Sequence, residues 1–205
     1  MIYYILNRVK EYQPVISVDN MFTDEELDKI NSQLSSVETK AAIAGWDKPI
    51  ISDEDMDSAV THSHIARKSN VYWLDKPEYL WIYEKLQVAI NHVNNLNYHK
   101  MLYGIESLQY TEYDSKYNGF YTAHVDALED NNNPLVRSLS FSVQLSRSED
   151  YEGGDVKIYY NDKAFTANRT YGTITFFDSR ILHEVTPVTS GFRKSLVGWI
   201  HGPRV

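Results

Sequence analysis

A series of short segments with strand-like patterning fills the second half of this 205-residue chain and limits the folds open to it. From Leu139 to Leu145 apolar and polar residues alternate without a break, the pattern of a strand with one buried face. Turn-forming residues separate the segments from one another. The other predicted strands are Ile105–Tyr113, Tyr121–Val125, Val156–Tyr160, Thr173–Phe177, Ile181–Val185 and Ser195–Ile200. Seven or eight short strands in about 100 residues predict a sandwich, a barrel or a jelly roll.

The first half of the chain predicts helices after an extended stretch at Pro14–Val18. Thr23 and Glu26 have the spacing of a capping box, so a helix is expected to begin there. Apolar residues follow at helical spacing: Leu27, Ile30, Leu34 and Val37. A second helix is expected to open near Pro77. Its predicted buried stripe consists of Ile82, Leu86, Ala89, Val93 and Leu96.

The length favours one domain spanning residues 1–205. Within it, residues 1–103 are expected to form a helical support and residues 104–205 a β-rich core, with the two helices covering one outer face. Residues 38–70 are the least regular stretch and are a candidate lid or substrate-binding region. The acidic run Asp53–Asp57 in that stretch fits a solvated loop better than a receptor for a basic peptide.

Charge and composition exclude several classes of protein. The formal net charge is −8, which argues against binding nucleic acid through its phosphates. The chain has no cysteine, so disulfides, thiolate catalysis and cysteine-ligated metals are excluded. The apolar start Met1–Leu6 is too short for a signal peptide, and no stretch is long enough to span a membrane. We therefore expect a cytoplasmic protein, while the oligomeric state stays undetermined.

Two histidines and one aspartate have the spacing of a metal site. His124 and Asp126 are two residues apart on a predicted strand, so their side chains point to the same face. His183 lies within another predicted strand. Two neutral imidazoles and one carboxylate form the facial triad that non-haem Fe(II) oxygenases use, with coordination positions left open. A His-x-Asp pair alone is common by chance, so the prediction depends on its companions.

The companion is Arg193, ten residues after His183. Arg193, Ser195 and Trp199 share one face if this segment is a strand. A guanidinium with a hydroxyl two residues away is a good receptor for a carboxylate, because its planar fork makes two parallel hydrogen bonds. By contrast, His62 and His64 have no carboxylate at a suitable spacing and are predicted not to be ligands.

These motifs, in this order, resemble the iron- and 2-oxoglutarate-dependent dioxygenases, in particular the prolyl 4-hydroxylase-like group and its bacterial PKHD-type relatives. The resemblance covers roughly residues 103–201, about half of the chain. Its motifs are specific for the cofactor chemistry and much less so for the substrate. The matching segments are Tyr103–Tyr110, Tyr121–Asp126, Arg137–Leu145, Tyr151–Asp155, Phe177–Val188 and Gly191–Trp199.

The resemblance implies a double-stranded β-helix, that is, a cupin-like jelly roll supported by helices on one face. It implies that His124, Asp126 and His183 ligate Fe(II) and that Arg193 binds the distal carboxylate of 2-oxoglutarate, with help from Ser195. A tyrosine of the preceding strand is also expected to contact 2-oxoglutarate. Both Tyr113 and Tyr110 qualify, on opposite faces of the strand, and Tyr113 is preferred. Trp199 is expected either near the cofactor or in plain core.

The resemblance further implies that O2 and 2-oxoglutarate are consumed, with release of succinate and CO2, while an unactivated C–H bond is hydroxylated; ascorbate is a candidate reductant. The expected substrate is a prolyl residue in a peptide or protein. The same chemistry on a small molecule or free amino acid is one alternative. A jelly roll that binds without catalysis is another, and a metal hydrolase with the same ligands is a third, although a hydrolase would not need Arg193.

Overall fold

Antiparallel pairing joins all the strands of the described part of the chain into one 14-stranded sheet. The computed structural model describes residues 12–45, 49–50, 65–127 and 134–204. The first five strands along the chain are β1 (Val15–Val18), β2 (Lys40–Gly45), β3 (Pro49–Ile50), β4 (Ile65–Leu74) and β5 (Gly104–Ile105). The central strands are β6 (Leu108–Asp114), β7 (Phe120–His124), β8 (Leu135–Gln144), β9 (Tyr151–Gly153) and β10 (Val156–Tyr160). The last are β11 (Lys163–Thr166), β12 (Ile174–Asp178), β13 (Leu182–Val185) and β14 (Val188–Pro203).

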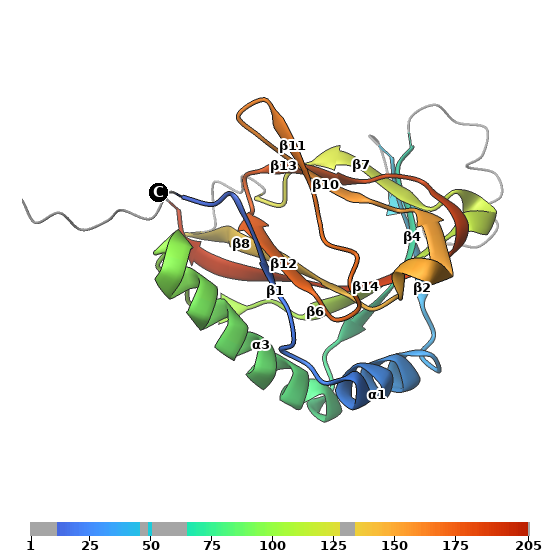
Figure 1. Cartoon of the computed structure of the whole chain (residues 1–205), viewed down its shortest axis with the longest axis horizontal. Coiled ribbons are helices and arrows are strands. Elements are labelled where there is room, and N and C mark those ends of the chain that lie inside the picture. Colours follow the sequence, from blue (N-terminus) through green and yellow to red (C-terminus); the bar gives the residue numbers. More distant parts are fainter. Residues whose placement is uncertain (1–11, 46–48, 51–64, 128–133, 205) are drawn as a thin grey trace, which may run out of the picture.

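The order of strands along the sheet is β1-β12-β8-β14-β6-β4-β7-β13-β10-β11. Sequence neighbours are therefore rarely sheet neighbours, and the chain crosses back and forth. The sheet curves on itself, so that β7, β13 and β10 face the layer that contains β8, β14 and β6 (Figure 1). The long strand β14 pairs with both β8 and β6 in that layer. This mainly β architecture with few helices is the fold class that the sequence predicts.

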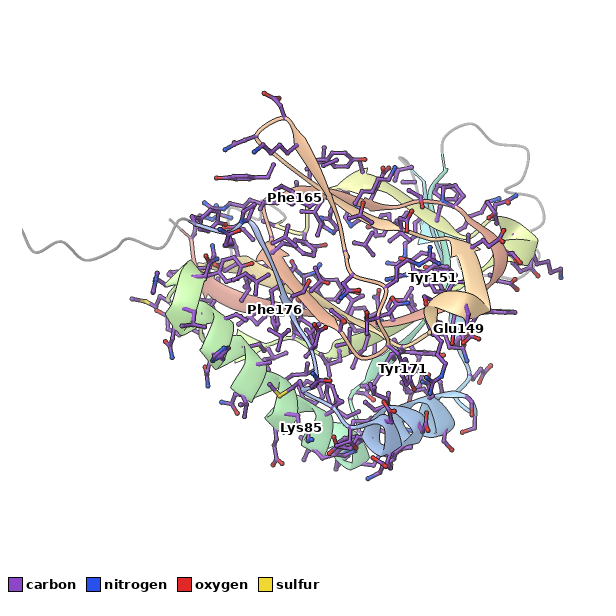
Figure 2. The ribbon with its side chains drawn as sticks, viewed as in Figure 1. Lys85, Glu149, Tyr151, Phe165, Tyr171 and Phe176 are labelled. Carbon is purple, nitrogen blue, oxygen red and sulfur yellow. The ribbon has the colours of Figure 1, made fainter. Side chains whose placement is uncertain are left out.

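Two helices, α1 (Asp24–Leu34) and α3 (Leu80–Val93), lie on the outer side of the β8–β14–β6 layer (Figure 1). The predicted capping box is present: the Glu26 amide donates to Thr23 Oγ1, and the Thr23 amide donates to the Glu26 carboxylate. The Glu26 carboxylate also accepts a 2.5 Å bond from Nζ of Lys85, the α3 residue labelled in Figure 2. The two helices are therefore tied to each other as well as to the sheet.

The helices bury the predicted stripes with two exceptions. Leu96 is 46% exposed, because α3 ends at Val93 and a π-helical turn over Asn94–Tyr98 rotates the face that follows. That turn buries Tyr98 instead, whose hydroxyl donates to the Phe176 carbonyl. Val37 lies beyond the end of α1 and is only partly buried against the same core.

The first half is less helical than the sequence predicts. Residues 38–70 include β2, β3 and most of β4, where we expected an irregular stretch. The strand β4 is central, pairing with both β6 and β7. Its charged and polar run Arg67–Asn70 hides the alternation that marks a strand, although Lys68 and Ser69 are buried. The acidic run Asp53–Asp57 and His62 and His64 lie outside the described residues.

Two apolar cores divide the interior. The larger lies between the helices and the sheet and includes Tyr110, Phe141 and Phe176, the last of which is labelled in Figure 2. The smaller includes Tyr113 and Phe177 and lies beside the candidate site. Tyr110 and Tyr113 are three residues apart on β6, so alternation sends their side chains to different cores. None of the described helices is both long and apolar enough to cross a bilayer.

Candidate metal and cosubstrate site

Two neighbouring strands bring the predicted metal ligands together. His124 ends β7 and lies directly opposite His183 of β13. Asp126 follows two residues after His124 and is buried. Nε2 of His124 is 3.7 Å from Asp126 Oδ1, and Nε2 of His183 is 3.4 Å from Asp126 Oδ2. The ligand atoms of the three side chains all lie within 4.8 Å of one another, which is compact enough to surround one ion.

Backbone carbonyls orient both imidazole rings in the same way. Nδ1 of His124 is 2.8 Å from the Thr122 carbonyl, and Nδ1 of His183 is 3.0 Å from the Ile181 carbonyl. A carbonyl only accepts, so Nδ1 of each neutral ring must carry the proton. The lone pair of each Nε2 is then free and points toward Asp126. Such outer hydrogen bonds fix the tautomer of metal-binding histidines.

Serine hydroxyls hold the carboxylate of Asp126. The Ser140 hydroxyl donates to Asp126 Oδ2 at 2.7 Å and lies 2.8 Å from the Ser179 hydroxyl. The Asp126 amide donates to the Ser179 carbonyl. Because both the main chain and the side chain of Asp126 are held, its carboxylate has a fixed direction.

The surroundings keep His124 neutral. Burial lowers the pKa of the His124 imidazole to about 4, with the neighbouring His183 as a second cause. The ring of Tyr121 stacks on His124 at a centroid distance of 3.6 Å. Two imidazoles whose Nδ1 atoms are held by carbonyls, together with one buried carboxylate, fit a divalent cation. They are the donor set of the Fe(II) facial triad.

Arg193 supplies a buried positive charge. Its residue is 3% exposed, and it lies opposite Tyr113 in the β14–β6 pair. Its guanidinium donates to the Ser195 hydroxyl at 3.4 Å, and no acidic side chain of the described residues pairs with it. A buried guanidinium without an acid is costly unless a ligand supplies the anion. The site is therefore suited to a carboxylate.

Gly154 leaves room for this arginine. Its φ of +63° is one that side chains rarely adopt, and a Cβ there would lie 3.0 Å from Arg193 Cδ and 2.8 Å from Val188 Cγ2. Gly154, which lies three residues after Tyr151 (labelled in Figure 2), thus lets the backbone approach the arginine closely.

The metal-ligand group and Arg193 share one cavity of about 210 Å³. The cavity collects the predicted residues His124, Asp126, His183, Arg193, Ser195, Tyr113 and Trp199. Tyr110 does not line it: its hydroxyl donates to Glu112 on the other side of the sheet. Among the two tyrosines left open by the sequence, Tyr113 alone faces the cavity.

Other residues of the cavity were not predicted. Arg67 and Trp73 come from β4, and Arg67 lies in the stretch 38–70 that the sequence left irregular. Arg137 lies in a motif of the resemblance, but nothing in the sequence assigned it a role. Its guanidinium lies 3.8 Å from the ring centroid of Trp199 and makes two hydrogen bonds, of 2.7 and 2.8 Å, to Glu106. Burial disfavours the charged form of Glu106, yet the bonds from Arg137 and His201 outweigh it and lower the pKa of Glu106.

A curved antiparallel β barrel with two imidazoles and one carboxylate in its cavity has the architecture of a non-haem iron oxygenase. Comparison with known proteins agrees. Residues 108–201 match the 2OG-Fe(II) oxygenase superfamily. A PKHD-type hydroxylase of Crocosphaera subtropica is 26% identical over 193 residues, which is 91% of this chain and 78% of that protein. Further PKHD-type hydroxylases are matched over 30% to 64% of their length.

Solved structures share the fold. A prolyl-4-hydroxylase of Pseudomonas putida superimposes with a TM-score of 0.63 at 18% identity, covering 94% of each chain. A prolyl hydroxylase of Trichoplax adhaerens, in complex with a hypoxia inducible factor peptide fragment, gives a TM-score of 0.65 at 16% identity. That match covers 91% of this chain and 83% of the other. These likenesses support a 2OG-Fe(II) oxygenase of the prolyl 4-hydroxylase-like kind, and the predicted jelly-roll fold is confirmed.

Proposed function

We propose that the protein is an Fe(II)- and 2-oxoglutarate-dependent dioxygenase that hydroxylates a prolyl residue of a peptide or protein and releases succinate and CO2. The observation that carries the proposal is that the buried guanidinium of Arg193, which has no acidic partner among the described residues, lines the same cavity as the His124–Asp126–His183 group. One cavity therefore offers a divalent-cation site and a carboxylate site together.

In this proposal Nε2 of His124, Nε2 of His183 and the Asp126 carboxylate hold Fe(II). Bound iron supplies the oxidation, using O2 and 2-oxoglutarate, and ascorbate serves as the reductant that keeps it divalent. Three ligands from the protein leave positions open for the cosubstrate and O2. The carbonyl-fixed rings and the serine-held carboxylate keep these donors directed at one point.

Arg193 anchors the far carboxylate of 2-oxoglutarate, since a planar guanidinium can make two parallel hydrogen bonds to it. The Ser195 hydroxyl, already bonded to Arg193, orients that fork. Tyr113, opposite Arg193 on β6, presents its ring 5.7 Å from the guanidinium carbon and is placed to contact the cosubstrate.

The remaining wall supports a peptide substrate. Trp199 is 6% exposed, and its indole N–H has no acceptor among the described residues. A peptide carbonyl would satisfy this donor, because buried donors are rarely left unpaired. Trp73 also lines the cavity and is 39% exposed, so its ring offers a flat apolar surface for a prolyl ring to pack against. In the Trichoplax adhaerens complex, a prolyl hydroxylase of the same fold binds a peptide fragment.

Succinate formation tests the proposal. The purified protein is incubated with Fe(II) and 2-oxoglutarate, aerobically and anaerobically, with pools of proline peptides, of proline-free peptides or of small metabolites. We expect aerobic succinate formation that proline peptides stimulate, with a mass gain of one oxygen on proline. Stimulation by metabolites alone would move the substrate to small molecules. Failure to bind either iron or 2-oxoglutarate would leave a non-catalytic binding module.

A further inference from the structure

Uncharged partners hold the guanidinium of Arg67 in the wall of the cavity. On β4, its Nε donates to the Ser69 hydroxyl at 2.7 Å, and its Nη2 donates to Gln109 Oε1 at 2.7 Å. The guanidinium carbon lies 4.8 Å from the ring centroid of Tyr121, which in turn stacks on His124. The positive charge of Arg67 is thus fixed one aromatic ring away from a proposed metal ligand.

Arg67 differs in its charge balance from the other arginines of the cavity. Arg137 is neutralised by Glu106 through two hydrogen bonds. Arg193 is assigned to the cosubstrate. Arg67 pairs with no acidic side chain in the part of the chain that the structure describes. Its partner Gln109 is neutral, and Gln109 Oε1 also accepts from the Thr111 hydroxyl at 3.3 Å.

Among the described residues, the charges of the loaded site leave Arg67 without a counterpart. Fe(II) with the Asp126 carboxylate and doubly charged 2-oxoglutarate with Arg193 cancel one another. The Arg137–Glu106 pair is neutral. One positive charge therefore remains on the wall, in a cavity where water screens it less than in bulk. A cation held in place by neutral acceptors is pre-organised for an anionic ligand.

Arg67 also has donors to spare. Ser69 and Gln109 take Nε and one hydrogen of Nη2, and no acceptor is found for Nη1 among the described residues. A guanidinium has five N–H donors, so at least two remain for a ligand.

We propose that Arg67 recognises a carboxylate of the substrate, so that the reacting carbon lies close to an acidic group. This inference rests on the proposed function and adds the chemical class of the substrate to it. The carboxylate has two sources, the side chain of an acidic residue next to the oxidised one in a peptide or the free carboxylate of an amino acid. Arg67 acts on both through the same paired hydrogen bonds.

The test compares four pools of probes with the Fe(II)-loaded, full-length protein and 2-oxoglutarate. Two pools are randomised five-residue peptides, blocked at both ends, with either Asp or Asn fixed at the centre. The other two are free amino acids and the corresponding amino acid amides. Succinate formation and the mass gain of one oxygen are measured. We expect the carboxylate pool of one pair to exceed its neutral partner by about tenfold in stimulation. The pair that responds identifies the source.

Three variants assign the effect to Arg67, and a fourth is the control. Gln109→Glu places a carboxylate on the existing Arg67 hydrogen bond with almost no change of shape and should reduce the acid-to-amide ratio to about one. Arg67→Lys keeps the charge and should retain part of the ratio, whereas Arg67→Gln should lose it. Arg147→Gln removes an exposed arginine that does not line the cavity and should leave the ratio unchanged. Each ratio is measured within one variant, so its overall rate does not matter.

The outcomes separate the two proposals. Consumption of 2-oxoglutarate with no preference for either carboxylate pool would overturn the inference and leave the proposed function in place. An undiminished ratio in Gln109→Glu or Arg67→Gln would also overturn it. Absence of any 2-oxoglutarate consumption or binding would instead refute the proposed function, and the inference with it.

Discussion

His124 and His183 are direct cross-strand partners, and their ring centroids lie 4.2 Å apart. Burial lowers the pKa of the His124 imidazole, and the neighbouring His183 acts in the same direction. The fold thus brings the Nε2 atoms of both rings to one point beside Asp126. The pairing of β7 with β13 is what turns residues nearly sixty positions apart into one site.

Removing one of these ligands should abolish metal binding without unfolding the barrel. We expect Mn(II), used as a redox-stable probe, to raise the melting temperature of the wild-type protein, because a ligand that binds only the native state stabilises it. His183→Ala and Asp126→Asn should show no such rise. His92→Ala, on the exposed face of α3, is the matched control and should respond like wild type. A full rise in either ligand variant would place the ion elsewhere.

Ser140 is predicted to act on metal affinity through Asp126. Ser140→Ala removes the 2.7 Å hydrogen bond that directs Asp126 Oδ2, and outer partners of this kind typically contribute tenfold or more to metal affinity. Calorimetric titration with Mn(II) should show affinity weakened by about tenfold. The exposed Ser148→Ala provides the comparison. Unchanged affinity in Ser140→Ala would mean that the β-strand backbone alone positions the carboxylate.

Arg193 is predicted to contribute to binding of 2-oxoglutarate and not to binding of the metal. A charge-assisted pair is worth roughly 1.5–3 kcal/mol, so Arg193→Ala should weaken 2-oxoglutarate binding by about 10–100-fold while the Mn(II)-induced rise in melting temperature persists. Arg193→Lys keeps the charge but loses the planar fork and should fall between the two. Calorimetry with 2-oxoglutarate checks this in the Mn(II)-loaded protein. Equal loss of metal and 2-oxoglutarate binding would contradict the separate roles.

The sequence predicted the parts of the site that local spacing can specify. A strand puts residues two apart on one face, so His124 and Asp126 were expected together, and the same rule separated Tyr113 from Tyr110. Residues brought in by long-range pairing were not predictable in this way. Arg67 reaches the cavity only because β4 pairs with β6 and β7, and its polar sequence carries no strand pattern.

Helix ends set a second limit on prediction. The apolar spacing after Pro77 continues through Leu96, yet the structure changes from α to π geometry after Val93. Leu96 then points to solvent while Tyr98 enters the core. The π-helical turn is wider than an α-helical turn, so it changes which positions face the core. A pattern with a fixed period of 3.6 residues cannot predict that change.

Asp178 should make the free energy of unfolding depend on pH in the acid range. Burial favours the neutral carboxyl, but hydrogen bonds from Arg180 and Lys100 outweigh it and lower the pKa of Asp178 to about 2. Its folded pKa lies below the unfolded value near 3.8, so the stabilisation is complete above about pH 4 and is lost as the pH falls toward 2. The shift corresponds to about 2 kcal/mol of the free energy of unfolding. Asp178→Asn should therefore lower that free energy at pH 6 and flatten its decline between pH 4 and 2, measured by urea denaturation with tryptophan fluorescence.

Asp162→Asn, in the exposed turn between β10 and β11, makes the same change of charge and should leave the decline as in wild type. Parallel acid profiles for Asp178→Asn and wild type would show that Lys100 and Arg180 do not stabilise the folded state through this carboxylate.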